Sequence, residues 1–301
     1  MSHLQASQLF SVDGLVVIVT GGGSGLGRTM ALTLAENGAS KVFILGRREE
    51  ALQETAALSK KDSIIPVKAD ITSKESLQAA YDTIAEQTDH VNLLIANSGV
   101  LGDIMRPPGP KPDGSIPSLS EVRDHLWSFP TEEFSSVMDI NVTGTYYTVL
   151  AFLPLLDAAN KRRPAPVKNQ PAAPTAQVII TSSIAAYNRR VAFNFAYNLS
   201  KAATNHLIKI LSTTLTPYHI RVNGTAPGLY LSEMTTSSFG SEDSGVSDGS
   251  FPSEMVPLTR AGSDQEFAGM VLWMASASGA FINGNITVTD GGRLSTVPCT
   301  Y

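Results

Sequence analysis

The sequence predicts an α/β fold built on a doubly wound parallel sheet, and three observations support this. Short apolar runs alternate with helical patterns along the 301 residues, the order expected of parallel strands joined by helices. The runs do not alternate strictly between polar and apolar residues, as expected when helices cover both faces of a sheet. A glycine-rich turn, TGGGSGLG at 20–27, follows the first run directly. We therefore expect a ligand site at the carboxyl ends of the strands.

Seven apolar runs are expected to form the strands. In chain order they span residues 15–20, 41–46, 63–68, 91–96, 176–181, 220–225 and 286–290. Helical stretches lie between most of them, and no break in composition divides the chain. We therefore expect a single domain over residues 1–301.

Three segments interrupt this alternation: 102–130 with six prolines, 160–175 with basic residues and prolines, and 235–253 with serine, glycine and acidic residues. Loops that follow strands face the ligand crevice, whereas loops that enter strands lie at the opposite edge. The first and third segments are therefore expected to border the active site, as insertions at 102–130 and 229–262. The second is expected to be a distant surface loop. The third has the composition of a lid that closes over a substrate.

Composition excludes several classes of protein. With 43% hydrophobic and 16% charged residues, the chain favours a large buried core over disorder. Its net charge of −5 argues against nucleic-acid binding. A single cysteine, Cys299, and five scattered histidines argue against disulfides and a metal site. The N-terminus does not resemble a signal peptide, and no apolar stretch reaches the roughly 18 residues of a membrane span, so we expect a cytoplasmic protein with no membrane partner.

The glycine-rich turn has the properties of a dinucleotide phosphate site. Gly21, Gly25 and Gly27 permit a tight turn and let the backbone approach a pyrophosphate at a helix N-terminus. The spacing is G-x3-G-x-G rather than the common G-x-G-x-x-G. An ordinary glycine-rich turn between strand and helix is the alternative interpretation.

The residues after the second predicted strand indicate which dinucleotide binds. An NAD-selective site places a carboxylate near this point, whereas this chain has Arg47 and Arg48. The guanidinium of Arg47 suits a 2′-phosphate, which favours NADP(H); a solvated cation at a helix start is the alternative. Asp70, just past the third strand, is a candidate acceptor for the adenine amine.

Tyr197 and Lys201 form the candidate reaction pair. They stand four residues apart in AYNLSKAA, so on a helix they share one face. A nearby cation favours the phenolate and lowers the pKa of tyrosine, which would make it a useful acid. Ser182 and Ser183 end the fifth predicted strand, where a hydroxyl could reach the same substrate oxygen. Either serine could instead cap a turn, and we prefer Ser183 for the catalytic role.

On these motifs the chain resembles the short-chain dehydrogenase/reductase family over residues 13–293, in the branch with a Tyr-x-x-x-Lys motif, which includes 3-oxoacyl-carrier-protein reductases and fungal ketoreductases. Asn141 in DINVTG matches the family's catalytic Asn, and 96–99 matches its Asn-Asn-Ala-Gly segment with two changes. The resemblance implies a Rossmann-like fold, with Asn141, Ser183, Tyr197 and Lys201 as catalytic residues. The cofactor-binding residues that it implies are Gly21, Ser24, Gly25, Leu26, Gly27, Arg47, Arg48, Asp70, Ile71, Asn97, Gly99, Tyr197, Lys201, Pro227, Gly228 and Ser232.

The resemblance also implies a mechanism. Tyr197 would donate a proton to a carbonyl oxygen while a nicotinamide delivers hydride to the carbon, and Ser183 would orient that oxygen. Lys201 would lower the tyrosine pKa and hold the nicotinamide ribose, and Asn141 would hold a water. A homotetramer or homodimer built from the helices that carry Asn141 and Tyr197 is also implied.

Aromatic residues in the segments near the crevice suggest an apolar or aromatic carbonyl or alcohol substrate, although such side chains are more often core anchors. They are Trp127, Phe193, Phe195, Tyr230, Phe239 and Phe251. Two other functions stay open on the same residues. One is an imine reductase or a redox-neutral acid/base enzyme, and the other is an NADP-binding sensor or scaffold without turnover.

Overall fold

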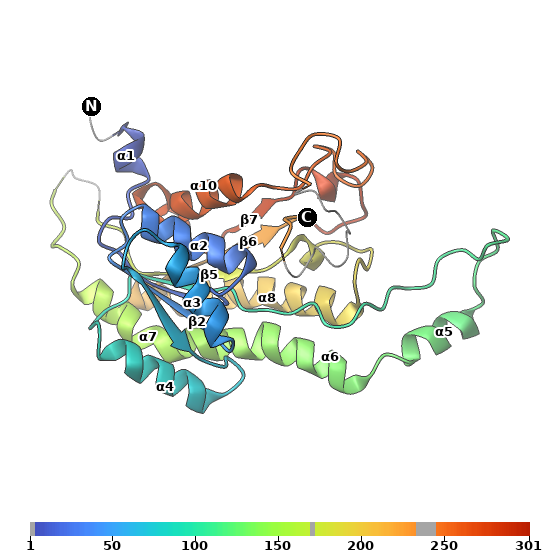
Figure 1. Ribbon diagram of the computed structural model, residues 1–301, viewed down its shortest axis with the longest axis horizontal. Helices are drawn as coiled ribbons and strands as arrows, with labels where there is room; N and C mark the ends of the chain where they lie inside the picture. The colour runs from blue at the N-terminus through green and yellow to red at the C-terminus, as the bar shows by residue number, and fades with distance from the viewer. Residues whose placement is uncertain (1–3, 169–171, 233–244) are drawn as a thin grey trace.

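A computed structural model describes residues 4–168, 172–232 and 245–301. Its centre is a seven-stranded parallel sheet in the order β3-β2-β1-β4-β5-β6-β7 (Figure 1). The strands are β1 (Val16–Thr20), β2 (Lys41–Gly46), β3 (Ile64–Lys68), β4 (Leu93–Ala96), β5 (Gln177–Thr181), β6 (Arg221–Pro227) and β7 (Ile286–Thr289). Each lies within two residues of its predicted bounds, and the predicted doubly wound, single-domain fold is confirmed. The strand order reverses between β1 and β4, the place where ligands bind in such sheets.

Helices cover both faces of the sheet and bury a separate apolar cluster on each. On one face lie α2 (Gly25–Glu36), α3 (Glu49–Leu58) and α10 (Asp264–Ala275); on the other lie α4 (Lys74–Ala85), α7 (Thr145–Lys161) and α8 (Phe195–Thr214). Successive side chains of β1 enter opposite clusters, since Ile18 belongs to the cluster that contains Phe152 whereas Val17 and Val19 belong to the one that contains Leu34. Burial on both faces explains why the strand sequences are apolar throughout.

The remaining elements are short or lie outside these layers. They are α1 (Ala6–Leu9), α5 (Leu119–Trp127), α6 (Thr131–Met138), a π-helical turn (Asp139–Gly144) and 3-10 turns at Ile184–Ala186, Thr216–Tyr218, Ala277–Gly279 and Arg293–Ser295.

The α6 helix, the π-helical turn and α7 form one continuous helix, Thr131–Lys161. By length and composition this helix could cross a membrane, and 44% of its apolar window is buried within the molecule. Val149, Phe152 and Leu156 have no exposed surface and pack on the sheet. The core helices of soluble proteins can be equally long and equally apolar. The π-helical turn, which adds a residue to one helical turn, contains Asn141.

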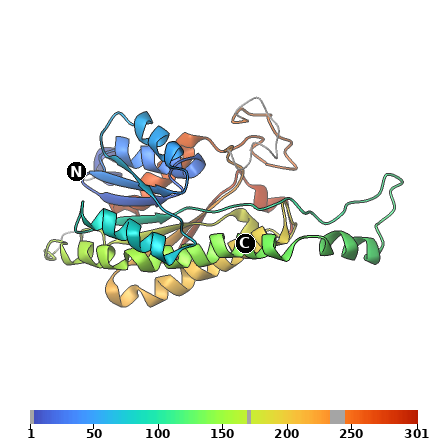
Figure 2. The same cartoon turned by 60° about the horizontal axis from the view of Figure 1, so that its bottom comes forward.

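Residues 103–130, which we call the arm, correct one prediction from the sequence. The whole 102–130 segment was expected to border the active site, but most of the arm projects away from the sheet (Figures 1 and 2). Its helix α5 has no buried residue, and Ile116 and Leu119 are 86% and 84% exposed. The base of the arm, residues 103–106, lies against the segment that leads into α8 and so borders the site, whereas the rest stays outside the core because α5 buries none of its side chains.

The other two irregular segments lie at opposite edges of the sheet. The segment before β5 turns back at the edge away from the carboxyl ends of the strands, as expected, and Arg163 donates to the carbonyl of Ala173 within it. The expected lid falls partly on 233–244, outside the described residues. From residue 245 the chain returns towards the cleft wall, and Gly262 forms a parallel bridge with Tyr230.

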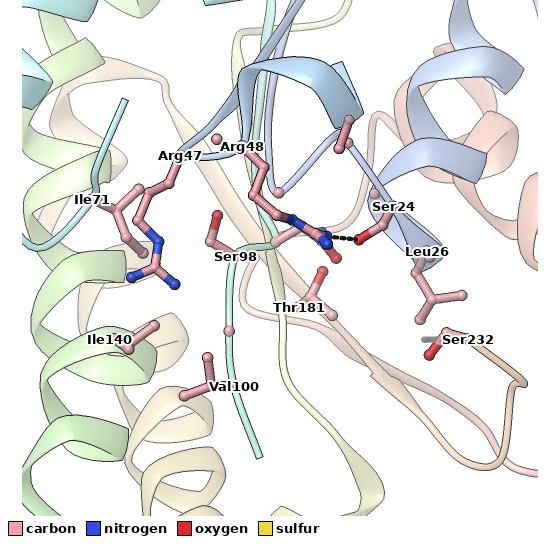
Figure 3. Close-up of a pocket in the computed structure, with 18 of the residues that line it drawn as sticks. Ser24, Leu26, Arg47, Arg48, Ile71, Ser98, Val100, Ile140, Thr181 and Ser232 are labelled. Carbon is pink, nitrogen blue, oxygen red and sulfur yellow. Dashed lines mark hydrogen bonds between the residues drawn. The ribbon is translucent and has the colours of Figure 1, made fainter. Parts of the chain in front are cut away.

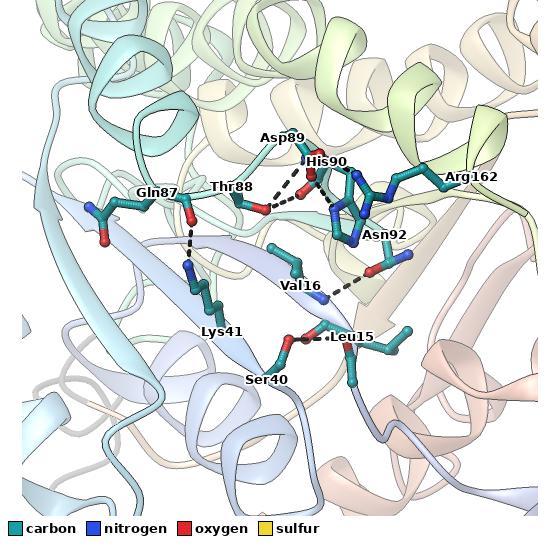
Figure 4. Close-up of polar contacts among 11 residues, drawn as sticks. Leu15, Val16, Ser40, Lys41, Gln87, Thr88, Asp89, His90, Asn92 and Arg162 are labelled. Atoms are coloured by element: carbon teal, nitrogen blue, oxygen red, sulfur yellow. Dashed lines mark hydrogen bonds and ion pairs between the residues drawn. The ribbon is translucent and has the colours of Figure 1, made fainter.

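Polar contacts hold the edge of the sheet opposite the candidate site (Figure 4). Asn92, just before β4, accepts a hydrogen bond from the backbone N–H of Val16 at 2.9 Å. Lys41 at the start of β2 donates to the carbonyl of Gln87, and Arg162 pairs with Asp89. These contacts fix the starts of β1, β2 and β4 and so help to set where the opposite ends of the strands lie.

Candidate active site

An open cleft of about 320 Å³ lies at the carboxyl ends of the strands, across the reversal of strand order. Its walls come from the turns after β1 to β6, segments far apart in the sequence. All the cofactor-binding residues expected from the sequence line this one cleft, namely Gly21, Ser24, Gly25, Leu26, Gly27, Arg47, Arg48, Asp70, Ile71, Asn97, Gly99, Tyr197, Lys201, Pro227, Gly228 and Ser232. Their roles stay predictions, but the structure brings them together.

The glycine-rich turn is packed too tightly for side chains. A Cβ on Gly27 would lie 2.1 Å from the carbonyl oxygen of Gly21 and 2.6 Å from Nδ2 of Asn97. Gly21 itself has φ 68°, a left-handed conformation that favours glycine. The first turn of α2 can therefore lie directly against the end of β1, with its unpaired N–H groups at the cleft. Gly25 packs directly against Ser232, since a Cβ there would lie 3.2 Å from Cβ of Ser232.

Two arginines after β2 enter the cleft from one side (Figure 3). Arg48 Nη2 donates to Oγ of Ser24 at 3.1 Å, which joins the end of β2 to the glycine-rich turn. Arg47 extends towards Ile71 and Ile140 on the opposite side. Two guanidinium groups thus bracket the part of the cleft that β1, β2 and β3 form.

Asp70, at the end of β3, is held by its own turn. Its Oδ1 accepts from the backbone N–H of Thr72 at 2.9 Å and from the Thr72 hydroxyl at 2.7 Å. The pKa of Asp70 is lowered, chiefly by the backbone hydrogen bond from Thr72, further by the Thr72 hydroxyl and the charge of Arg47. Asp70 is therefore a carboxylate at neutral pH. Its expected contact with an adenine amine stays a prediction.

The turn after β4 is tied to the end of β1. The backbone N–H groups of Asn97 and Ser98 donate to Oγ1 of Thr20 at 3.0 and 3.1 Å, and Asn97 Nδ2 donates to the carbonyl of Thr20 at 3.1 Å. Next along the chain, a Cβ on Gly99 would lie 3.0 Å from Oδ1 of Asn141 and 3.4 Å from Nζ of Lys201. The absence of a side chain at Gly99 lets these groups meet beneath the cleft.

Asn141 lies behind the cleft wall rather than in it, and it is 1% exposed. Its side chain exchanges two hydrogen bonds with the backbone of Val100, at 2.8 and 2.9 Å, and Nδ2 also contacts Oγ of Ser200 at 3.0 Å. Ser200 is on α8, so Asn141 joins the turn after β4 to the helix that carries Tyr197 and Lys201. Its expected role in holding a water stays a prediction.

The two serines at the end of β5 point in different directions. The Ser183 hydroxyl lies beside the Tyr197 phenol, and its hydrogen bond to the phenol oxygen lowers the pKa of Tyr197. Ser183 Oγ also accepts from the backbone N–H of Ala185 at 3.1 Å. The buried Ser182 hydroxyl instead donates to the carbonyl of Lys201 at 3.3 Å. This geometry supports Ser183 as the serine that shares a substrate oxygen with Tyr197.

The expected lowering of the Tyr197 pKa by Lys201 is not what the structure shows. Burial raises the pKa of Tyr197, and the hydrogen bond from Ser183 opposes this shift. Lys201 Nζ lies 5.8 Å from the centre of the phenol ring and donates to the carbonyl of Thr181 at 3.0 Å. Burial lowers the pKa of Lys201 to about 8. The physical reason is that both groups are removed from water, which penalises the phenolate and the ammonium alike.

Some of the aromatic residues expected around the substrate lie at the cleft, and others do not. Tyr230 lines the cleft, and the Phe193 ring meets the Tyr197 ring edge-on with centroids 5.8 Å apart. Trp127 is 75% exposed on α5, where it contacts Arg123, so its expected place in a substrate pocket is wrong. Phe195 is 42% exposed and does not line the cleft. Phe251 packs beside Gly245, and Phe239 lies outside the described residues.

The cleft also contains residues that sequence reasoning missed. Ser98, Val100, Ile140 and Thr181 all line it, and Val100 and Ile140 provide apolar surface near Arg47 (Figure 3). Each is adjacent or nearly adjacent to a residue that the sequence did indicate, which was the available signal. The Thr181 hydroxyl is buried without a hydrogen-bond partner in the part of the chain that the structure describes.

Comparison with known proteins agrees with this geometry. A family model described as short chain dehydrogenase matches residues 15–243. The chain is 42% identical over 301 residues to the short-chain dehydrogenase/reductase PhomF of Diaporthe leptostromiformis, covering 99% of this chain and 97% of that protein. It is 30% identical over 284 residues to the rhamnolipids biosynthesis 3-oxoacyl-[acyl-carrier-protein] reductase of Pseudomonas aeruginosa, covering 94% and 97% of the two chains.

A solved structure from the same bacterium, the Pseudomonas aeruginosa RhlG/NADP active-site complex, has a TM-score of 0.76 and 29% identity, with 94% of this chain and 98% of that chain covered. The chain belongs to the short-chain dehydrogenase/reductase family of oxidoreductases.

Proposed function

We propose that this protein is an NADP(H)-dependent oxidoreductase that interconverts a ketone and a secondary alcohol by hydride transfer. One observation carries the proposal. Ser183, Tyr197 and Lys201 meet in the cleft whose other part is a side-chain-free phosphate cradle with two arginines. Binding alone would need no buried phenol with a serine hydroxyl beside it, which argues against a sensor or scaffold.

The residues of the cleft fit NADP(H). The space that a Cβ would fill at Gly27 and Gly21 lets a pyrophosphate reach the N-terminus of α2. Arg47 and Arg48 line the cleft and would supply the positive charge for the 2′-phosphate of the adenosine ribose, and no carboxylate follows Gly46 directly. The similar Pseudomonas aeruginosa structure is a complex with NADP, in line with this choice. When bound, the nicotinamide supplies or accepts the hydride.

The chain's own residues would manage the proton. Because burial raises its pKa, the Tyr197 phenol is protonated at neutral pH and can donate to the oxygen of a carbonyl substrate. Ser183 would donate a second hydrogen bond to that oxygen and stabilise its growing charge. Below pH 8 the Lys201 ammonium favours the phenolate that forms when the proton leaves. In the reverse direction the phenolate would accept the proton of the alcohol.

The substrate side of the cleft favours an apolar or aromatic ketone. The Phe193 ring meets the Tyr197 ring edge-on, which places an aromatic surface beside the reacting phenol. Apolar walls with a few convergent polar groups are typical of sites for small organic molecules.

We also propose a homodimer or homotetramer that pairs α7 and α8 with the same helices of a second copy. Tyr146 on α7 and Leu199 and Ile210 on α8 are 38%, 52% and 49% exposed, although these helices otherwise pack in the core. Light scattering on the purified protein measures the mass directly, and a monomer at micromolar concentration would contradict this assembly.

Turnover tests the central proposal. We expect NADPH oxidation with members of a panel of apolar and aromatic ketones, and secondary alcohol as the product. Tyr197→Phe should reduce turnover by at least about 100-fold because the proton donor is lost, while NADPH affinity stays within about threefold. Retained turnover in this variant would contradict the role of the phenol. Amine product from imines would favour an imine reductase, and a lack of NADPH consumption with every substrate would favour a sensor or scaffold.

Cofactor choice is tested separately by Arg47→Ala. We expect this variant to weaken NADPH binding by about 10- to 100-fold, since a charge-assisted contact with the 2′-phosphate is lost, and NADH binding by less than about twofold. Lys68→Ala, which removes an exposed cation on the neighbouring strand, is the matched control. Equal weakening of the two cofactors in Arg47→Ala would overturn the NADP(H) assignment.

A further inference from the structure

Asn194 is a buried side chain at the start of the helix that carries Tyr197. It is the N-cap residue of α8, has extended backbone angles (φ −152°, ψ 167°) and is 1% exposed. Its Oδ1 accepts the backbone N–H of Tyr197 at 2.7 Å. The first turn of α8, and with it the backbone of Tyr197, is therefore held by this one amide.

The other end of the amide is bound to a different part of the molecule. Nδ2 of Asn194 donates to the carbonyl of Leu101 at 2.8 Å and to the carbonyl of Asp103 at 2.7 Å. Both carbonyls belong to the loop after β4, where the arm begins. Since carbonyl oxygens can only accept and the Tyr197 N–H can only donate, these partners fix the orientation of the amide.

The surrounding backbone reinforces this contact. Gly102 adopts φ 68°, and a Cβ there would lie 2.6 Å from Val137 and 3.6 Å from Nδ2 of Asn194, so the loop lies directly on the amide. Met105 N–H donates to the carbonyl of Phe193 at 2.9 Å. Arg106 Nε donates to the carbonyl of Ala192 at 2.5 Å. The base of the arm and the residues that lead into α8 therefore run side by side.

We propose that Asn194 is a positioning residue that couples the base of the arm to the orientation of Tyr197. Its acceptor oxygen sets the turn that carries the phenol, and its two donor hydrogens tie that turn to residues 101–103. The neighbouring Phe193, whose ring meets Tyr197 edge-on, is held to the same loop through Met105. A substrate that contacts the base of the arm thereby influences where the Tyr197 hydroxyl lies. The catalytic consequence rests on the proposed function.

The alternative is that Asn194 acts only as a helix cap, and two variants separate these roles. Serine is about as good a cap as asparagine, but its short side chain cannot also reach two loop carbonyls. Asn194→Ser therefore keeps the cap and removes the tie to the loop, whereas Asn194→Ala removes both. The control Ser263→Ala removes the side-chain cap of α10, which lies on the other face of the sheet.

If Asn194 couples the loop after β4 to the start of α8, stability and turnover should respond differently to these substitutions. Asn194→Ala and Ser263→Ala should lower the melting temperature by about 2–4 °C, and Asn194→Ser by less. Turnover with the best ketone should fall by about tenfold or more in both Asn194 variants and by less than twofold in Ser263→Ala. The apparent pKa of kcat should also shift in Asn194→Ser, because the phenol no longer holds one position, while the KM for NADPH stays within twofold. Turnover and pH profile unchanged from wild type in Asn194→Ser would overturn the proposal.

Hydrogen exchange of the NADPH-bound protein tests the physical tie without any substrate. In Asn194→Ser the amides of residues 100–105 should exchange at least tenfold faster, whereas the Tyr197 amide should stay protected by the serine cap. Unchanged exchange in 100–105 would show that the tie is absent. If wild type turns over no ketone, the proposed function fails, but this measurement still decides whether Asn194 couples the loop to the helix.

Discussion

The two sides of the cleft are built in different ways. On the cofactor side, backbone turns at the ends of β1 and β4 pack so closely that a Cβ at Gly27 would overlap the carbonyl of Gly21. On the proposed substrate side, the boundary comes from the base of a long projecting arm, which the Asn194 amide ties to the start of α8.

This contrast indicates which side of the cleft sets specificity. A cradle of backbone N–H groups recognises a phosphate whatever the rest of the chain does, because its geometry depends on a few neighbouring residues. The substrate side depends on how distant segments meet. Changes on the cofactor side should therefore have large effects on binding, whereas those on the arm should have small ones.

The largest effect is expected from Gly27→Ala. The added methyl would overlap the Gly21 carbonyl, so α2 must move away from the end of β1 and the phosphate cradle opens. We expect NADPH affinity to fall by about 100-fold or more, roughly 3 kcal/mol, measured by fluorescence titration.

The matched control is Gly269→Ala in α10, where a Cβ would meet no atom within 4 Å. That change should raise the free energy of unfolding by about 0.5–1 kcal/mol, because alanine favours helix over glycine, and leave NADPH affinity unchanged. A Gly27→Ala protein with normal affinity would break the contrast between the two sides.

An intermediate effect is expected from Lys201→Met at the junction of the two sides. Burial lowers the Lys201 pKa to about 8 from the ordinary 10.5, so below pH 8 the folded protein carries a penalised ammonium. The unfolded chain binds more protons between pH 8 and 10.5, so this penalty is complete below 8 and disappears as the pH rises towards 10.5. Replacing Lys201 should therefore raise the free energy of unfolding at pH 7 by about 1–3 kcal/mol. The loss of the hydrogen bond from Lys201 to the Thr181 carbonyl offsets part of this gain, and the gain should be smaller at pH 10 than at pH 7.

Urea unfolding at pH 7 and pH 10 measures this gain, together with turnover, which should be largely lost. Lys209→Met, an exposed change on the same helix, should alter stability by less than about 0.5 kcal/mol at either pH. A destabilised Lys201→Met protein at pH 7 would show that the ammonium is better satisfied than its burial implies.

The smallest effect is expected from Trp127→Ala at the end of α5 in the arm. Trp127 is 75% exposed and contacts Arg123 of its own helix, so its removal should change the free energy of unfolding by about 0.5 kcal/mol or less. Turnover and KM should stay within about twofold. A tenfold loss of turnover would instead show that the arm contributes to a site, and the substrate side would extend farther than the cleft described above.

The sequence predicted the strands well because their physical signal is local. A run such as LVVIVT can be buried on both faces only inside a covered parallel sheet, and the glycines that follow it require a turn without side chains. The candidate site was also largely predictable, since the residues at the ends of these strands must meet at one edge. The path of the 102–130 segment was not predictable, because its prolines do not indicate whether the chain folds over the cleft or away from it.

The amino-acid pattern alone was enough to predict the strands, the glycine-rich turn and the placement of Tyr197 and Lys201 on one helix face, because each of these depends on residues close together in the chain. The packing of distant segments determines that Ser183 rather than Ser182 faces the phenol, that Trp127 lies outside the cleft, and that Asn194 joins two segments far apart in the sequence. It also decided the direction of the Tyr197 pKa shift. The reason is that helical spacing places a cation near a phenol, but the loss of water around both depends on the whole fold.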